Sequence, residues 1–233
     1  MQVIQRFIFF IGFGILLTCC NLYAMDNSAK AQAAFDKATD YAQQGEYTKA
    51  LKYIKESYKL EPADGTAFNL GYAYEKLKDY PNAIKWYKQA FKMGNRGGAI
   101  NLGLLYHTKL KDYPNAIIWY KKAFNAGDAV SGRNLALLYE NTLKDNKNAI
   151  IWYKKAIAKG DIDSRKNLGL LYHELGDDLH SVAYMMGMIG HPYTKERALG
   201  FFRKTWKIDE PTLKKAYELQ KKLVPDPYTG GIE

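Results

Sequence analysis

The chain has little cysteine and little proline. Its 233 residues contain two cysteines, Cys19 and Cys20, which stand side by side, so the rest of the chain has neither a disulfide framework nor a zinc site of paired cysteines. Seven prolines among 47% apolar and 25% charged residues describe a folded globular chain rather than a disordered or collagen-like one. We therefore expect a core held together by side-chain packing, to which nineteen tyrosines contribute.

Catalytic motifs are also lacking. His173 and Glu174 are followed by Leu-Gly-Asp, so they do not form the H-E-x-x-H pair of a zinc protease, and there is no G-x-S-x-G turn or glycine-rich phosphate loop. Asp177 and Asp178 form a carboxylate pair in a turn, which favours a helix cap over general acid–base chemistry. We expect no enzyme, no catalytic residue, no cofactor and no metal.

The first 24 residues differ in kind from the rest. Arg6 is the only charged side chain before Asp26, and residues 7–17 are an almost unbroken apolar run. A membrane span needs about 20 apolar residues, whereas this run has the length of the apolar region of a secretory signal, about 7–15 residues, and Ala24 is a small residue at a cleavage position. The sequence predicts a signal peptide over residues 1–24.

Two alternatives for this segment stay open. Residues 17–20 resemble a bacterial lipobox in which Cys20 is acylated, and an uncleaved anchor helix is the other alternative. All three place the rest of the chain outside the cytoplasm, in the periplasm or envelope or secreted from the cell. With the signal cleaved, as predicted, the mature chain is expected to have no transmembrane domain.

A repeat of 32 or 33 residues runs through the chain. A block with the pattern Asn-Leu-(Gly/Ala)-x-x-Tyr, with alanine in the third copy, begins at four asparagines spaced by 32, 33 and 33 residues, namely Asn69, Asn101, Asn134 and Asn167. A second block, Ala-Ile-x-Trp-Tyr-Lys-x-Ala, follows the first three copies and begins at Ala83, Ala116 and Ala149. A period of this length is the mark of a solenoid of stacked units.

Each unit is predicted to be two short helices. Ala83, Tyr87, Ala90 and Phe91 recur at i, i+4, i+7 and i+8, which is one face of an α-helix. In the preceding turn an aspartate caps the second helix and a proline sits in its first turn. Glycines then end each second helix where a left-handed residue is favoured, at Gly94, Gly127 and Gly160.

These blocks resemble the tetratricopeptide (TPR) family and, within it, the Sel-1-like repeats of bacterial exported proteins. The first block resembles the family's Leu-Gly-x-x-Tyr, and the tryptophans of the second, with the later glycine, resemble the Sel-1-like variant. An earlier unit begins near Gly45, and the second and third clear copies carry one extra residue in the turn. The resemblance implies an all-α, right-handed α-solenoid of about five helix pairs over residues 25–190.

The fifth unit and the C-terminal part depart from the repeat. The helix expected over 180–189 carries Met185, Met186 and Met188 in place of the second block, which favours core filling over a copper site. Residues 195–207 and 211–224 read as two amphipathic helices, with Phe201, Phe202 and Trp206 facing inward on the first. They predict capping helices over 191–224 and a flexible tail over 225–233.

For function, the resemblance implies capture of a protein or peptide segment in the concave groove of the solenoid. The recurring asparagine lies on that side in the family, where its amide can bond the backbone of a peptide; the alternative is a bond to neighbouring helices or water. The candidate groove residues are Asn69, Tyr72, Glu75, Asn101, His107, Arg133, Asn134, Glu140, Lys166, Asn167 and His173.

Charge offers a second interpretation. The net charge is +10, and +9 once Arg6 leaves with the signal (10 − 1), and many lysines lie in the second blocks. A basic face suits an anionic envelope or host-surface component, although a solvated outer face explains the same lysines. Nucleic acid is not expected as a partner of an exported chain. A weaker alternative, a cell-wall-related hydrolase, follows only from the resemblance to Sel-1-like proteins.

Overall fold

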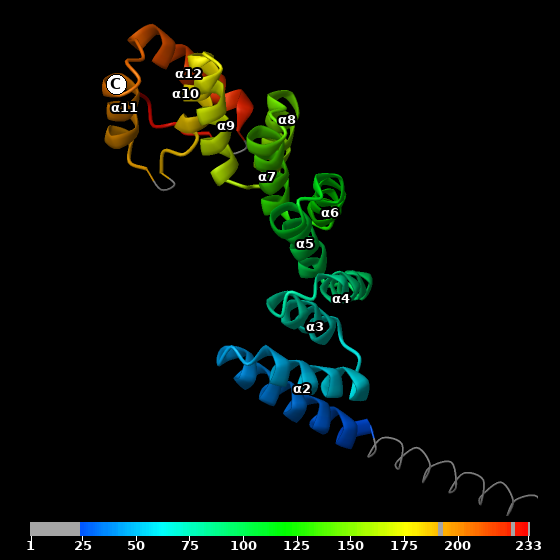
Figure 1. Cartoon of the computed structure of the whole chain (residues 1–233). Coiled ribbons are helices and arrows are strands. Elements are labelled where there is room, and N and C mark those ends of the chain that lie inside the picture. The colour runs from blue at the N-terminus through cyan, green and yellow to red at the C-terminus, as the bar shows by residue number, and fades with distance from the viewer. Residues whose placement is uncertain (1–23, 191–192, 225–226, 233) are drawn as a thin grey trace, which may run out of the picture. The chain divides into compact units, whose positions relative to one another are not determined.

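Helices form most of the chain that the structure describes. The computed structural model describes residues 24–190, 193–224 and 227–232 (Figure 1). The predicted signal peptide and the lipobox at Cys20 lie outside these residues, apart from Ala24. Within the described part, the only β-type pairing is an isolated bridge between Ile189 and Tyr193.

In chain order the helices make five pairs and a final hairpin, which confirms the predicted all-α repeat fold. They are the helix of residues 24–43, α2 (Tyr47–Leu60), α3 (Asp64–Lys76), α4 (Tyr80–Lys92), α5 (Arg96–Leu105), α6 (Tyr113–Asn125), α7 (Ala129–Leu137), α8 (Asn146–Ala158), α9 (Asp163–Glu174), α10 (Asp178–Met186), α11 (Lys195–Lys204) and α12 (Glu210–Leu223). We call α3, α5, α7 and α9, which carry the asparagine blocks, the first helices, and α4, α6, α8 and α10 the second helices.

The chain divides into two compact units, one ending at Leu102 and the other beginning at Gly103, within α5. In the first unit α3 packs against both α2 and α4, around a core that includes Ile54 and Leu70. In the second unit α7 packs against α6 and α8, and α9 packs against α8 and α10. Within each unit, consecutive pairs therefore share a packing surface. The predicted division between residues 190 and 191 stays a prediction.

The turns between paired helices are built as the sequence predicts. Asp79 accepts a hydrogen bond from the backbone N–H of Asn82 (3.2 Å), and Asp112 accepts one from Asn115 (3.1 Å). Each aspartate thereby satisfies one of the free N–H groups at a helix start. At the far end of the second helices, Gly94, Gly127 and Gly160 have φ of +104°, +99° and +88°, which confirms their predicted left-handed position.

The extra residue of the second and third copies forms a π-helical turn. The first helix α5 continues into η1 (Tyr106–Leu110), and α7 continues into η2 (Leu138–Thr142). A π turn accommodates one more residue than an α turn over the same span. The tyrosine carbonyl of each block therefore still accepts from the N–H of the capping aspartate, at 2.8–2.9 Å, in the four pairs Tyr74–Asp79, Tyr106–Asp112, Tyr139–Asp145 and Tyr172–Asp177.

The small residues of the blocks allow paired helices to approach closely. A Cβ added to Gly71 would lie 2.5 Å from the ring of Tyr87, and one added to Gly103 would lie 2.4 Å from that of Tyr120. Both distances are below van der Waals contact. Ala83 and Ala90 are fully buried on the facing helix. These residues are structural, as expected from their recurrence.

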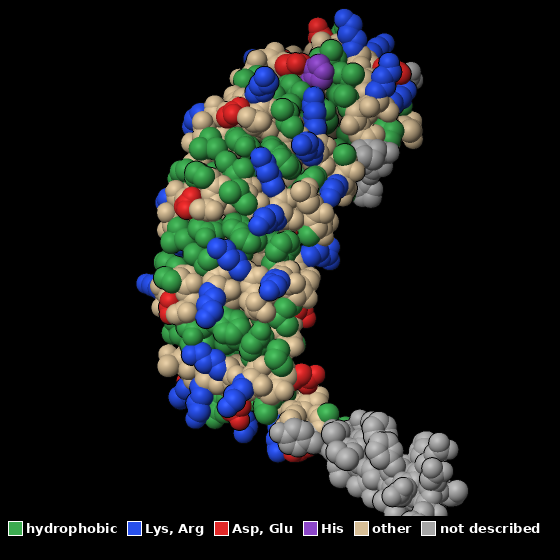
Figure 2. All heavy atoms as spheres, turned by 90° about the vertical axis from the view of Figure 1, so that its right-hand side faces the viewer, with side chains coloured by type: hydrophobic (Ala, Val, Ile, Leu, Met, Phe, Trp, Pro, Cys, Tyr) green, Lys and Arg blue, Asp and Glu red, His purple; other side chains and the backbone are tan. Residues whose placement is uncertain are grey.

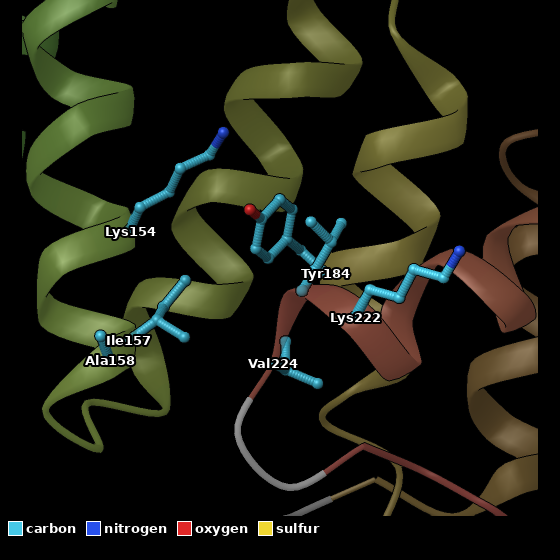
Figure 3. A pocket seen from close by; sticks show the side chains of 7 residues that line it. Lys154, Ile157, Ala158, Tyr184, Lys222 and Val224 are labelled. Atoms are coloured by element: carbon cyan, nitrogen blue, oxygen red, sulfur yellow. The ribbon is translucent and has the colours of Figure 1, made fainter.

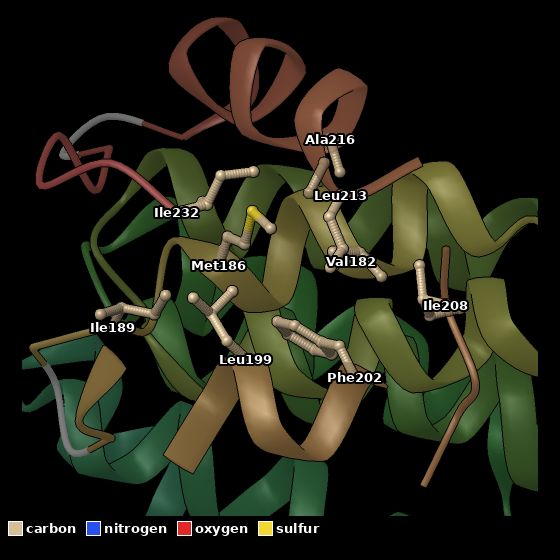
Figure 4. Close-up of a cluster of buried hydrophobic side chains, with 10 residues drawn as sticks. Val182, Met186, Ile189, Leu199, Phe202, Ile208, Leu213, Ala216 and Ile232 are labelled. Atoms are coloured by element: carbon tan, nitrogen blue, oxygen red, sulfur yellow. The ribbon is translucent and has the colours of Figure 1, made fainter. Parts of the chain in front are cut away.

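The C-terminal hairpin packs on the last pair through a continuous apolar core (Figure 4). Phe202 and Leu213, from α11 and α12, meet Val182 and Met186 of α10. Met186 and Met188 are buried, which fits the core-filling interpretation. The expectation that Phe201 faces inward is wrong, because that ring is 37% exposed.

Residues 227–232, which belong to the predicted flexible tail, make defined contacts with the C-terminal hairpin. Ile232 is buried in the hairpin core, and its carbonyl accepts a hydrogen bond from Arg203 (3.3 Å). The buried amide of Gln220 accepts from the N–H of Tyr228 (2.9 Å), and the hydroxyl of Tyr217 donates to the Thr229 carbonyl (3.0 Å). The polar composition of this segment gives no sign of this packing, because its hydrogen bonds to the hairpin are made mainly by its backbone.

Candidate functional site

The first helices carry nearly all of the predicted groove residues, and a tyrosine of the second helix holds several of them. In the first unit the hydroxyl of Tyr87 donates to the carboxylate of Glu75 (2.7 Å), and the amide of Asn101 donates to the same hydroxyl (3.1 Å). The ring of Tyr87 is fully buried. Burial, followed by the bond to Glu75, raises the pKa of Tyr87, so the hydroxyl stays protonated.

The second unit repeats this arrangement. The hydroxyl of Tyr153 donates to Glu140 and bonds the amide of Asn167 from the next repeat. One copy earlier, the ring Nδ1 of His107 lies 3.2 Å from the hydroxyl of Tyr120. Burial, with a smaller contribution from the Lys111 charge, lowers the pKa of His107, which favours a neutral imidazole.

Two of the four asparagines, Asn101 and Asn167, therefore bond the preceding repeat. Asn69 and Asn134 occupy the same register and are half-buried. An amide has two donors and an acceptor, so a bond to tyrosine leaves capacity for a partner. Whether the asparagines bind a peptide backbone stays a prediction.

The remaining charged groove residues have varied surroundings. Arg133 pairs with Asp163 and lies 3.4 Å from Asp161, so it joins α7 to the start of α9. His173 bonds Asp178 (2.7 Å) and stacks on Trp206 with the ring centroids 4.0 Å apart. Lys166 is exposed and pairs with no acidic side chain of the described residues.

The sequence predicts Tyr72 as a groove residue, but sequence reasoning missed that exposed apolar side chains recur at its position of the repeat. Three of the residues that stand three places after a block asparagine are exposed. They are Tyr72 (37% exposed), Leu104 (38%) and Leu170 (37%). All four blocks carry an apolar residue at this position, with Leu137 partly buried in the third. The recurrence of an apolar residue at this position was the sequence signal from which a contact surface could have been predicted. A side chain that is apolar, exposed and repeated is suited to contact a partner.

The helices α6 and α8 form a surface that is basic, unlike that of the first helices. The helices α6 and α8 contain no acidic residue. Lys122 lies over the ring of Trp119 (4.2 Å) and Lys155 over that of Trp152 (4.3 Å). Figure 2 looks onto this side, where basic side chains are interspersed with hydrophobic ones, and the exposed Ile118 belongs to α6. We call this surface the α6–α8 face.

An open cleft adjoins the α6–α8 face. It has a volume of about 440 Å³ and lies between α8, α10 and the end of α12 (Figure 3). Its wall includes the ring of Tyr184 and the side chains of Ile157 and Val224. Lys154 extends over it from α8, whereas the ammonium group of Lys222 turns away. A single cation over an apolar wall is weak support for an anion site.

Two further structural findings bear on function. Among the described residues, no three His, Cys, Asp or Glu side chains are placed to share a metal ion. In the same part of the chain, no helix combines the length and apolar character needed to cross a membrane.

Parts of this chain are similar to known proteins. The family model described as Tetratricopeptide repeat matches residues 35–97. The structure is similar to that of a MamA protein (22% identity, 77% of this chain and 96% of that chain, TM-score 0.52). It is also similar to a Sel1 repeat protein from Oxalobacter formigenes (22% identity, 82% and 87%, TM-score 0.53) and to Pseudomonas aeruginosa PilF (16% identity, 86% and 94%, TM-score 0.58).

Residues 35–97 match the tetratricopeptide repeat family, and the described helix pairs have the fold of TPR and Sel1 repeat proteins. At these identities the likeness is one of fold, and no curated protein matches the chain. The family match covers the first two units of the repeat, and the structure extends the same helix pairing through α10. The TPR/Sel-1-like fold supports a protein–protein interaction scaffold, and such repeats are typically non-catalytic.

Proposed function

We propose that this repeat protein is an exported scaffold that binds a segment of a partner protein along its first helices, on the concave side of the solenoid. The fold supports a protein partner. The proposal of export, to the periplasm or envelope of a bacterium, rests on the apolar run and the cleavage position at Ala24 in the sequence.

The observation that carries this proposal is the recurring exposed apolar side chain of the first helices. Tyr72, Leu104 and Leu170 are each more than one third exposed at the same position of the repeat. In contrast, Glu140 and Asn167 are engaged with a buried tyrosine. We therefore assign partner contact chiefly to these recurring apolar side chains and to exposed neighbours such as Lys166.

Site-specific photo-crosslinking tests this assignment. A benzophenone amino acid is placed at Leu104 or Leu170 and, as the comparison, at Ile118 or Ile151 of the α6–α8 face, which are at least as exposed. The full chain is expressed in a bacterial host, irradiated, and its adducts are identified by mass spectrometry. We expect a protein adduct at the first-helix positions and none at the isoleucines. Adducts only at the isoleucines would contradict the proposal.

A second candidate function is binding of an anionic envelope component through the α6–α8 face. It is favoured by the absence of acidic residues from α6 and α8 and by lysines held over tryptophan rings. Sedimentation with vesicles of anionic lipid tests it, because binding through exposed lysines should fall steeply between about 0.05 M and about 0.5 M salt. Equal sedimentation with neutral vesicles would contradict this candidate.

A further inference from the structure

We propose that the apolar pocket between α9, α10 and α11 anchors one large apolar side chain of an acidic partner segment, whose carboxylates meet Lys166 and Arg197 at the rim. This inference rests on the proposed function and names the chemistry of the partner at one end of the repeat array.

The pocket is apolar inside and small. It has a volume of about 280 Å³, and Leu170, Met185, Phe201 and Phe202 form its walls. Sites for drug-sized ligands have volumes of about 300–1,000 Å³. A pocket at or below that lower limit suits a single bulky side chain, which is how the central residue of a protein interface is commonly held.

A departure from the repeat creates this pocket. Met185 follows Asn167 by 18 residues (185 − 167), as Tyr87 follows Asn69 (87 − 69), so methionine stands where other repeats have the buried tyrosine. Methionine has no hydroxyl to bond the first helix. A Cβ added to Gly169 would lie 2.4 Å from Cγ of Met185, so the two helices approach closely and the side chain lies along the pocket wall.

The aromatic wall is fixed before any partner binds. Phe201 lies 5.0 Å from the ring of Trp206 and 6.2 Å from that of Phe202, between centroids, and Trp206 stacks on His173. Although it is held in this way, Phe201 remains 37% exposed, as does Leu170 across the pocket. A preformed apolar wall reduces the entropy lost when a side chain enters it.

The positive charge at the rim of the pocket favours an acidic partner segment. Lys166 and Arg197 both line the pocket and are exposed. Neither forms an ion pair with a described acidic side chain, and the guanidinium of Arg197 lies over the ring of Tyr193 (5.6 Å). Two unpaired cations beside an apolar pocket complement a segment in which Asp or Glu flanks a large apolar residue.

Selection from a random nonapeptide library displayed on phage tests the proposal. The library is selected on the full-length protein, and the selected peptides are synthesised and measured by fluorescence anisotropy. We expect peptides in which a Phe, Trp, Leu or Met is flanked by Asp or Glu. Replacing that apolar residue by alanine should weaken binding by about 30-fold, the cost of removing a central anchor.

Three charge-reversal variants locate the site. Lys166→Glu and Arg197→Glu should each weaken these peptides by about tenfold. Lys204→Glu, the same change at an exposed position of α11 outside the pocket, should leave binding unchanged. With ¹³C-labelled methionine methyl groups, the Met185 resonance should shift on binding more than those of the buried Met186 and Met188. Circular dichroism confirms that each variant is folded.

Each result decides the proposal. Peptides without the acidic and apolar pattern, or equal binding by wild type and Arg197→Glu, would overturn it. If no peptide binds while Leu104 still crosslinks to a protein, the pocket proposal fails and the proposed function stands. If pocket-directed peptides bind and no first-helix crosslink forms in cells, the pocket stands and the proposed function fails.

Discussion

The hydroxyl of Tyr153 donates a hydrogen bond to the carboxylate of Glu140, and Asn167 of the next repeat bonds the same hydroxyl. One buried side chain therefore joins two first helices. In the first unit Tyr87 makes the same two bonds, with Glu75 and Asn101. The recurrence of the block asparagine is explained by this joint at two of its four positions, independently of any ligand.

Removal of the Tyr153 hydroxyl should therefore weaken the fold of the second unit. In Tyr153→Phe, Glu140 and Asn167 lose a common partner, and the half-buried carboxylate loses a donor. We expect the free energy of unfolding to fall by about 1–3 kcal/mol, the cost of leaving a buried polar group without its hydrogen bond. Urea unfolding at about pH 7 measures this change. A change within experimental error would show that water replaces the hydroxyl.

The same variant should show a distinctive pH dependence. Burial raises the pKa of Glu140, while the bond from Tyr153 lowers it. The pKa of Glu140 in the variant is therefore higher still, so the folded variant takes up a proton more readily as the pH falls. The difference in unfolding free energy between wild type and variant should shrink from about pH 7 towards about pH 4.5.

A matched control separates this effect from general acid sensitivity. Tyr184 is also buried, and burial likewise raises its pKa, but the described residues give its hydroxyl no bond to a carboxylate. The stability difference between wild type and Tyr184→Phe should stay constant over the same pH range. If both differences shrink alike, Glu140 is not the titrating group.

Alanine at Gly103 should destabilise the repeat because the added Cβ would lie 2.4 Å from the ring of Tyr120. We expect a loss of about 1–3 kcal/mol, which is typical of overpacking. Gly200 lies inside α11 with no atom within 4 Å of an added Cβ, so Gly200→Ala should stabilise by up to about 1 kcal/mol. Thermal unfolding of both variants checks the opposite signs, and equal effects would contradict the close approach.

The π-helical turn η1 should tolerate removal of its extra residue. Thr108 is exposed in η1, and its deletion restores the residue count of the first copy, whose helix α3 has no π turn. We expect deletion of Thr108 to cost less than about 1 kcal/mol. Deletion of Lys76 from α3 should cost more, because it moves the Asp79 cap out of register. Comparable losses in urea unfolding would show that η1 does not absorb the extra residue.

The repeated part of the fold could be predicted from the sequence because the same local signals recur in each copy. Period, capping aspartates and left-handed glycines all concern residues close together in the chain, and the structure confirms Asp112 and Gly127 in these roles. The sequence also shows the extra residue of the second and third copies, but it does not show that this residue forms a π-helical turn. That choice depends on the carbonyl of Tyr106 still reaching the N–H of Asp112.

The candidate site was less predictable because it depends on which side chains the packing exposes. The burial of Tyr153 draws Glu140 and Asn167 inward, which no local pattern reveals. Phe201 belongs to an amphipathic pattern that suggests burial, yet it lines a pocket. The pocket itself combines three helices, and the sequence gives no direct signal of such a combination.

Replacing Lys111 by glycine should stabilise the protein. Lys111 ends the first helix of its repeat with φ of +55°, in the left-handed region, and the equivalent residue of the last repeat is Gly176 with φ of +78°. A side chain in this conformation costs about 1–2 kcal/mol, whereas glycine adopts it freely but loses more entropy on folding. We expect a net gain of about 0.5–1 kcal/mol in the free energy of unfolding, measured by urea unfolding.

Lys109→Gly is the control for this prediction. It changes the same residue type two positions earlier, inside η1, and should cost about 1 kcal/mol because glycine weakens a helix interior. If urea unfolding gave both variants the same sign, backbone strain at Lys111 would not be the cause.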